Sequence, residues 1–195
     1  MPSIAGKNKD GESASKRLTY RHGNIRKEAV AVAYRMIARD GHEKLSLRQV
    51  AAGIGIAHRS LYNHFPDRQA LLDCVAAEAF SKLALRLKRT SDVIEFVRMY
   101  TRFALKNPLI YGLMTSRPHA TMKEKPDLQT AVHQVIAEAM RVSAGQQTDP
   151  AERRRIVMKN FILMHGGISL FASGILDFAN ENALINELSE MLAAS

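Results

Sequence analysis

Polar and cationic side chains gather in one short stretch of the chain, between Leu45 and Arg68. Its second half is filled with side chains that can form hydrogen bonds: His58, Arg59, Ser60, Tyr62, Asn63 and His64. Leu61 and Phe65 stand four residues apart among them, which is the spacing of one buried helix face. A short helix with a small apolar anchor and a polar, cationic outer face suits the major groove of DNA. An ordinary helical hairpin with a solvated face would have the same spacing, so the pattern alone leaves both interpretations open.

Two short helices and a turn must position these side chains. The first helix is predicted to begin after Ser46, because Ser46 and Gln49 have the spacing of a capping box. Gly53 and Gly55 supply the backbone freedom that a sharp turn requires. The second helix follows and must end before Pro66, which cannot continue a helix.

This stretch resembles the helix-turn-helix of the tetracycline-repressor (TetR) family of transcriptional regulators. The family signature combines a small-residue or glycine turn, a recognition helix ending in Leu-Tyr-x-His/Tyr-Phe, a polar cap and a Lys or Arg. The matching residues here are Ala51, Gly55, Leu61, Tyr62, Asn63, His64, Phe65, Asp67 and Arg68. Ala57 departs from the family, which usually has Ser or Thr as the cap of the recognition helix, at a cost of about 1 kcal/mol.

The resemblance implies an all-α regulator that binds a palindromic operator in double-stranded DNA as a homodimer. Arg48 and Arg59 are the best candidates for guanine contacts, since a guanidinium can donate to both O6 and N7. The residues that resemble the family's phosphate-facing or groove-wall positions are Ser60, Tyr62, His64 and Arg68. His58 and Asn63 suit either role.

Charge is divided unevenly between the two halves of the chain. Residues 1–90 hold 17 Lys or Arg and 8 Asp or Glu, whereas residues 91–195 hold 11 of each, so the whole net charge of +9 lies beside the helix-turn-helix. Polyanion binding by the N-terminal half predicts this segregation, and a generally charged surface does not. An anionic membrane fits less well, because no basic amphipathic helix with an aromatic face is present.

The chain divides into three expected segments. Residues 1–19 lack periodicity and mix Gly, Ser, Lys and Asp, which predicts a disordered tail that either attracts phosphates or has no role. Residues 20–68 form the three-helix DNA-binding domain, and residues 69–195 form a helical regulatory and dimerisation domain. Further helices are expected at about 67–89, 92–106, 109–114, 127–142, 150–176 and 182–194. A cytoplasmic protein is expected, because the sequence has neither an apolar signal segment nor a run of 18 apolar residues.

The C-terminal half resembles the TetR branch whose C-terminal domain is named for a Trp-His-Gly element. His165 and Gly166 stand as expected, and the tryptophan position falls on Phe161. The resemblance implies repression that is relieved when a small apolar effector enters the helical body. The expected pocket is lined by Met99, Phe103, Tyr111, Met114, Phe161 and His165. A filled core, with His165 as a hydrogen-bonded core residue, is the alternative.

The segment from Ile156 to Leu176 predicts a dimer. Its apolar residues surround the helix rather than lining one side, which is typical of a helix buried on all sides. A second chain is the natural cover for such a helix so late in a chain of this length. The expected interface anchors are Leu170, Phe171, Leu184 and Leu188.

Other functions have weaker support in the sequence. No catalytic triad order, nucleophile elbow or paired-carboxylate motif is visible, so no enzyme is predicted. No pair of histidines has a metal-binding spacing and a single Cys74 is no metal site, so no metal or cofactor is expected. Two alternatives remain: a DNA-binding regulator without a small-molecule effector, and a helical ligand-binding or enzymatic protein whose basic half is incidental.

Overall fold

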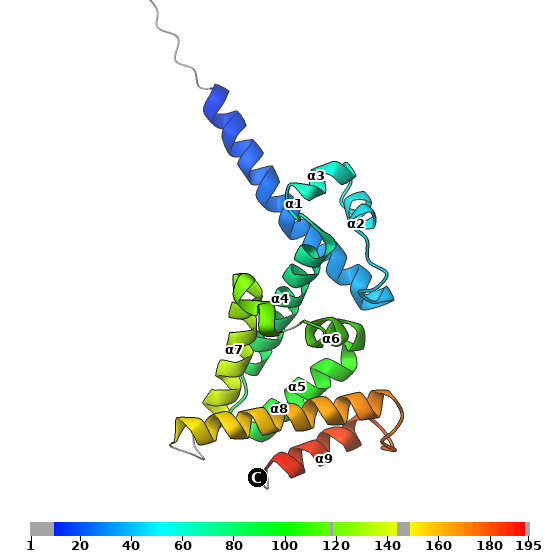
Figure 1. Ribbon diagram of the computed structural model, residues 1–195, viewed down its shortest axis with the longest axis vertical. Helices are drawn as coiled ribbons and strands as arrows, with labels where there is room; N and C mark the ends of the chain where they lie inside the picture. The colour runs from blue at the N-terminus through cyan, green and yellow to red at the C-terminus, as the bar shows by residue number, and fades with distance from the viewer. Residues whose placement is uncertain (1–9, 118, 144–148, 194–195) are drawn as a thin grey trace, which may run out of the picture.

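The computed structural model describes residues 10–117, 119–143 and 149–193, and every regular element in these ranges is helical (Figure 1). The all-α prediction is therefore confirmed. The α-helices are α1 (Asp10–Asp40), α2 (Leu47–Gly53), α3 (His58–Tyr62), α4 (Arg68–Leu87), α5 (Val93–Lys106), α6 (Pro108–Thr115), α7 (Pro126–Val142), α8 (Pro150–Ala172) and α9 (Glu181–Ala193), and a 3₁₀ helix, η1 (His119–Glu124), precedes α7.

Side-chain caps fix where several of these helices begin. At α2, Ser46 Oγ accepts from the Gln49 amide at 3.2 Å, and Gln49 Oε1 accepts from the Ser46 amide at 3.0 Å. This reciprocal pair is the capping box predicted from the sequence. Asp67 caps α4 by accepting from the Ala70 amide at 2.7 Å. Each cap satisfies backbone donors that a helix start leaves without an internal partner.

Helix α1 begins earlier than the sequence suggested. Residues 1–19 were expected to form a disordered tail, but α1 starts at Asp10. The expected tail is therefore wrong for residues 10–19, while residues 1–9 lie outside the described part of the chain. Starting a helix is costly and extending one is not, so a packed segment after Ile25 lowers the cost of adding residues before it.

Helix α4 connects the two ends of the molecule (Figure 1). The helix-turn-helix elements lie at one end, α8 and α9 lie at the other, and α4 packs most extensively along α7. One apolar stripe of α4 is fully buried: Leu71, Leu72, Val75, Ala79, Leu83 and Leu87. One helix therefore shares its packed face between the N-terminal domain and the body.

Helix α8 is covered on one side only within the single chain. Val157, Met164 and Ile168 are buried, whereas Met158 and Ile162 are 63% and 64% exposed. Leu170, one of the expected interface anchors, is 40% exposed. An apolar surface left bare by its own chain agrees with the expectation that a second chain covers α8.

The other expected interface anchors lie differently. Leu184 and Leu188 of α9 are only 1% and 4% exposed, because α9 turns them into its own chain against α5 and α8. Their prediction as interface anchors is wrong. Phe171 is half-buried, and its ring centroid lies 6.5 Å from that of Phe178.

Candidate nucleic-acid interface

The recognition helix α3 buries two side chains and exposes the rest. Leu61 and Phe65 are completely buried, as their spacing predicted. The exposed residues are Arg48 of α2 and His58, Arg59, Tyr62 and Asn63 in and after α3, while Ser60 and His64 are half-buried. The ring centroids of His58 and Tyr62 lie 5.0 Å apart in an edge-to-face arrangement. The predicted polar face is thus available to a groove of DNA.

The two glycines between α2 and α3 have different roles. Gly55 has a φ of +70°, so it supplies the left-handed turn that the sequence predicted. Gly53 has no positive φ, and a Cβ there would lie 2.9 Å from Val32 Cγ1 of α1. The expected backbone freedom is therefore wrong for Gly53, which instead allows α1 and α2 to pack closely.

The start of α3 has no side-chain cap. Ala57 stands at the N-cap and offers only its backbone carbonyl, which accepts from the Ser60 amide at 2.9 Å. This agrees with the departure from the family noted in the sequence. A five-residue helix without a cap depends on its packing and on contacts at its other end.

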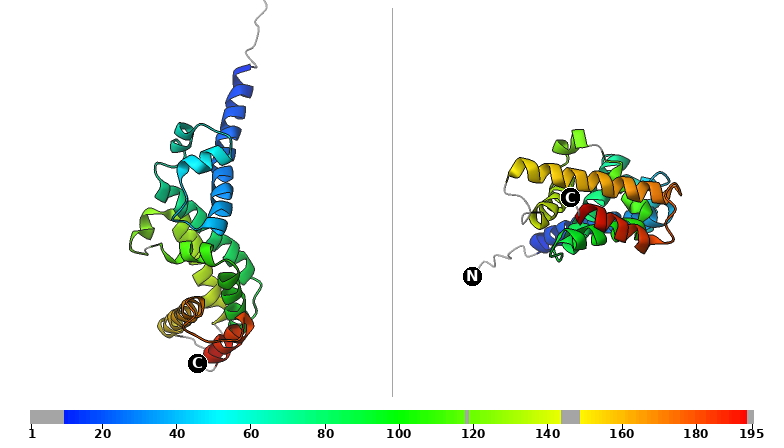
Figure 2. Two further views of the ribbon diagram at one scale, coloured as in Figure 1. Left: turned by 90° about the vertical axis from the view of Figure 1, so that its right-hand side faces the viewer. Right: turned by 90° about the horizontal axis from the view of Figure 1, so that it is seen from below.

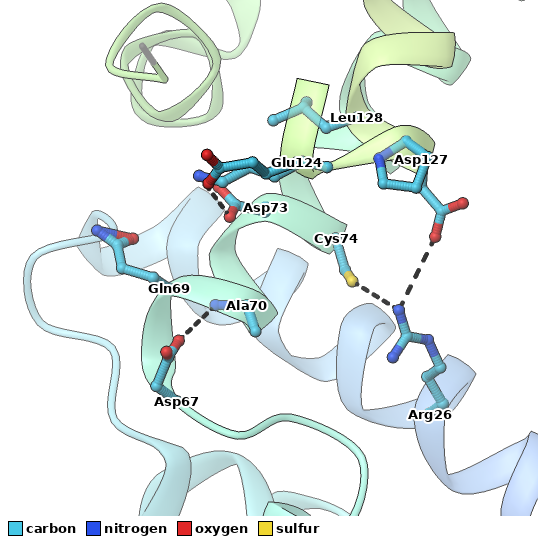
Figure 3. Close-up of a pocket in the computed structure, with 11 residues that line it drawn as sticks. Arg26, Asp67, Gln69, Ala70, Asp73, Cys74, Glu124, Asp127 and Leu128 are labelled. Atoms are coloured by element: carbon cyan, nitrogen blue, oxygen red, sulfur yellow. Dashed lines mark hydrogen bonds and ion pairs between the residues drawn. The ribbon is translucent and has the colours of Figure 1, made fainter. Parts of the chain in front are cut away.

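Arg26 of α1 supplies such a contact. One Nη donates to the His64 carbonyl at the end of α3 at 3.1 Å, and the guanidinium carbon lies 5.1 Å from the centroid of the Phe65 ring. The other Nη donates to Cys74 Sγ at 3.0 Å and lies 3.9 Å from an oxygen of Asp127 (Figure 3). Arg26 therefore links the recognition helix to α4 and to the start of α7. Arg26 was not identified from the sequence, because nothing in its spacing distinguishes it from the other cations of α1.

Arg68 performs a similar function at the other helix of the motif. From the first turn of α4 its guanidinium donates to the Leu45 carbonyl at 2.8 Å, to the Glu43 carbonyl at 3.2 Å and to the His42 carbonyl. These carbonyls belong to the segment between α1 and α2. Arg68 was expected at phosphates, but its donors hold this segment instead.

An Arg68→Ala variant is expected to weaken binding to all DNA sequences similarly while leaving the salt dependence of binding unchanged. Losing hydrogen bonds from a charged group costs about 1.5–3 kcal/mol each, and the loss would reach DNA through a displaced α2. If Arg68 contacted a phosphate, the substitution would instead reduce the slope of log association constant against log salt concentration by about 1. Fluorescence anisotropy at several salt concentrations distinguishes a structural role of Arg68 from a phosphate contact. A reduced salt dependence of binding in the variant would show that Arg68 contacts a phosphate.

Buried charges join α4 to the segment before α7. Asp73, with a side chain 12% exposed, lies 3.3 Å from Nη1 of Arg117 and 2.8 Å from Nζ of Lys125. Arg117 also donates to Gln69 Oε1 at 2.7 Å. Gln69, Asp73 and Lys125 border a groove of about 390 Å³ between α1, α4 and the start of α7 (Figure 3). Beside it, burial raises the pKa of the Cys74 thiol, which therefore stays protonated at neutral pH.

Three of the residues expected to line an effector pocket are buried in the single chain. Phe103, Tyr111 and Met114 are 3%, 6% and 2% exposed, while Met99 is half-buried. The Phe161 ring centroid lies 5.5 Å from that of Tyr100, and the void beside Phe161 holds only about 10 Å³. Within the single chain, this void is too small for an organic effector.

His165 is hydrogen-bonded but exposed. Its Nδ1 lies 3.0 Å from the hydroxyl of Tyr111, which is also hydrogen-bonded to Tyr100. Burial raises the pKa of both tyrosines, so their hydroxyls remain protonated. The alternative prediction of a hydrogen-bonded core histidine is therefore confirmed for the hydrogen bond. It is wrong for burial, because His165 is exposed.

Two features are absent from the part of the chain that the structure describes. No group of three or more His, Cys, Asp or Glu side chains in residues 10–117, 119–143 and 149–193 is arranged to hold a metal ion. Over the same part of the chain, no helix has the length and apolar character needed to cross a membrane.

Two protein families match this chain. Residues 29–75 match the bacterial regulatory proteins of the tetR family, and residues 93–193, more than half of the chain, match the tetracyclin repressor-like C-terminal domain. The narrower Trp-His-Gly branch stays a prediction.

Among curated proteins, the nucleoid occlusion factor SlmA of Serratia proteamaculans (strain 568) is 27% identical over 164 residues, 80% of this chain and 79% of that protein. SlmA of Photorhabdus laumondii is 29% identical over 122 residues, 58% of this chain, and there the match spans 60% of the relative's length.

Solved structures give the same fold. A protein of unknown function from Rhodococcus sp. RHA1 has a TM-score of 0.71 at 29% identity, over 86% of this chain and 93% of that one. RolR in complex with resorcinol has a TM-score of 0.64 at 18% identity, over 90% of this chain and 88% of that one. Regulators of this kind bind operator DNA as dimers and are not enzymes. The chain belongs to the TetR family of bacterial transcriptional regulators.

Proposed function

We propose that this regulator is a ligand-responsive repressor that binds a palindromic operator as a two-fold dimer in the bacterial cytoplasm. One observation carries the proposal: both helices of the helix-turn-helix are tied to the first turns of α4. Arg68 holds the segment before α2, and Arg26 joins the end of α3 to Cys74. Helix α4 also packs along α7 of the body. A tilt of α4 relative to the body would therefore move α2 and α3 as one unit.

Operator contacts are assigned to the exposed face of the motif. Arg59 of α3 and Arg48 of α2 are proposed to contact guanine bases, and His58 and Asn63 either bases or phosphates. Ser60, Tyr62 and His64 are proposed at phosphates or the groove wall. A two-fold dimer places two α3 helices one helical turn of DNA apart, or a multiple of it, so the operator is expected to be palindromic.

The effector site is proposed beside Phe161, with a polar residue that the sequence analysis missed. Asn160 of α8 is 7% exposed, and its Oδ1 has no hydrogen-bond partner in the described structure. It lines the small void together with Phe96 and Phe161, whose ring centroids lie 6.4 Å apart. An unpartnered buried acceptor among aromatic rings suits a small aromatic ligand that carries a hydrogen-bond donor. Resorcinol, which RolR binds, has this chemistry.

Ligand binding beside Phe161 requires the void to open. A volume of about 10 Å³ holds at most one water, so the ring of Phe161 must move to admit a ligand. This small volume also favours a second candidate function, a DNA-binding regulator without a small-molecule effector. The two candidates differ in whether any ligand releases operator DNA.

Selection of bound duplexes from a random-sequence pool, followed by titration with small phenols, tests this function. An inducing phenol is expected to weaken operator binding, and tenfold release needs only about 1.4 kcal/mol of coupling. By linkage, operator DNA must weaken the phenol by the same factor. Enrichment of a palindrome without any phenol effect would favour the second candidate, and no enrichment at all would reject operator binding.

An Asn160→Leu variant is expected to lose the phenol response and keep operator binding. Leucine has a similar volume and no acceptor, so the ligand's donor would be buried without a partner at a cost of about 1–3 kcal/mol. Ser169, exposed on α8 and outside the void, provides a matched control as Ser169→Ala. A phenol response that survives in Asn160→Leu would reject this site.

A further inference from the structure

The first turns of α4 hold the DNA-binding motif on one side and the body on the other. Arg68 and Cys74 face the motif: Arg68 donates to carbonyls of the segment before α2, and Cys74 accepts from α1. Gln69 and Asp73 face the body, where both accept from Arg117. Figure 3 shows Gln69 and Cys74 on opposite sides of the helix. The orientation of the motif relative to the body therefore depends on a short part of α4.

Asp73 joins α4 to two other helices through its two carboxylate oxygens. Oδ1 lies 3.3 Å from Nη1 of Arg117, which follows α6, and Oδ2 lies 2.8 Å from Nζ of Lys125, the N-cap residue of α7. The same Nη1 donates to Gln69 Oε1 at 2.7 Å, one turn before Asp73. The side chains of Arg117 and Asp73 are 7% and 12% exposed, so salt and water screen their attraction little. One carboxylate thus holds α4 to the end of α6 and to the start of α7.

These charged contacts restrict the tilt of α4 more than its apolar contacts do. Leu71, Leu72 and Val75 are fully buried, but the burial of apolar area is non-directional, and packed helices can slide past one another by small amounts. A hydrogen bond, in contrast, holds only over a narrow range of distance and angle. A tilt of α4 would move Asp73 away from Arg117 or Lys125 and leave a buried charge without its partner.

We propose that Asp73 is a positioning residue for operator binding. Its contacts with Gln69, Arg117 and Lys125, here called the Asp73 lock, hold α4 at the tilt that sets the distance between the two recognition helices of a dimer. The proposal rests on the operator binding proposed above and names the residue that regulates its geometry. Asp73 is 9% exposed and acts through α4 rather than by touching DNA. Without the lock, the recognition helices would sample several distances, of which a given operator fits one.

The first test is an Asp73→Asn variant, which removes the charge and nearly keeps the volume of the side chain. Binding is measured on the selected operator, on duplexes with one base pair more or fewer between the half-sites, and on a duplex with a single half-site. If the fitting distance falls to about a tenth of the population, the variant binds the selected operator about tenfold more weakly. Its preference for one spacing is expected to flatten. Half-site binding is expected to stay unchanged, because it does not depend on the distance between two recognition helices.

Glu138→Gln is the matched control. Glu138 accepts from Arg141 at 2.6 Å within α7, and its side chain is 18% exposed, so this variant also removes a paired carboxylate but leaves the Asp73 lock intact. The control is expected to keep the wild-type spacing preference. Lys125→Gln opens the lock from its more exposed end and is expected to act like Asp73→Asn, which keeps the test decisive if Asp73→Asn does not fold.

Three outcomes of these measurements would overturn the proposal. An equal loss on the operator and on the half-site would assign Asp73 to the folding of the motif. An unchanged spacing preference in a folded variant would show that other contacts set the distance. Tighter binding of the variant to the selected operator would show that the lock holds α4 at a tilt that does not fit DNA.

Distance measurement without DNA separates this inference from the proposed function. Nitroxide labels are attached through Ala52→Cys, exposed on α2, in a Cys74→Ser background, since serine can still accept the hydrogen bond from Arg26. Double electron–electron resonance then gives the distribution of distances between the two labels of a dimer. Asp73→Asn is expected to broaden this distribution, and an unchanged distribution would overturn the lock whatever the result of operator selection. A broader distribution without any enriched palindrome would support the lock and reject operator binding.

Discussion

Replacement of Ile162 by glutamate is expected to produce a monomer that no longer binds operator DNA. Ile162 lies on α8 and is 64% exposed in the single chain, near the exposed Met158. Burying a side chain of this size contributes about 1.5–3 kcal/mol, and a two-fold interface contains it twice. A glutamate there loses this contribution and must also be desolvated beside its symmetry mate, whose charge repels it. Without the dimer, two recognition helices cannot engage one operator together.

Sedimentation velocity at micromolar concentration, together with anisotropy on a selected duplex, measures both effects. Leu85→Glu is the matched control, because Leu85 is 67% exposed on α4 rather than α8. The control is expected to stay dimeric and to bind DNA. Ile162 is a better test than Phe171, whose contact with Phe178 would make a folding defect hard to separate from a monomer. A dimeric Ile162→Glu protein would place the interface elsewhere.

An Arg59→Ala variant is expected to lose about 1–3 kcal/mol of binding to its operator and to relax the preferred base at one position of each half-site. Arg59 is exposed on α3, where a guanidinium can donate to both O6 and N7 of guanine. The loss corresponds to about 5–150-fold in the association constant for the operator. The same substitution is expected to change binding to random DNA much less, since that binding depends on phosphates.

Binding of the variant is compared on the selected operator and on a scrambled duplex of equal length. Arg102→Ala removes the same charge from the exposed surface of α5 and is expected to affect both duplexes slightly. An equal loss on both duplexes for Arg59→Ala would exclude base contact by this residue and leave it a phosphate contact.

The sequence by itself determined the local structure of the DNA-binding motif. The starts of α2 and α4 followed from Ser46, Gln49 and Asp67, because a helix cap involves residues no more than three apart. The burial of Leu61 and Phe65 followed from their spacing on one helix. The family resemblance then assigned DNA binding, since the signature lies within a single continuous stretch.

The tertiary structure decided which side chains meet between elements. Arg26 contacts His64 and Cys74, which are 38 and 48 residues away, and no local pattern distinguishes it from the other cations of α1. Apolar periodicity likewise identified Leu184 and Leu188 as buried, but it did not indicate that their cover is their own chain rather than a second one. Periodicity reports that a helix face is removed from water, whereas the partner of that face depends on how distant helices pack.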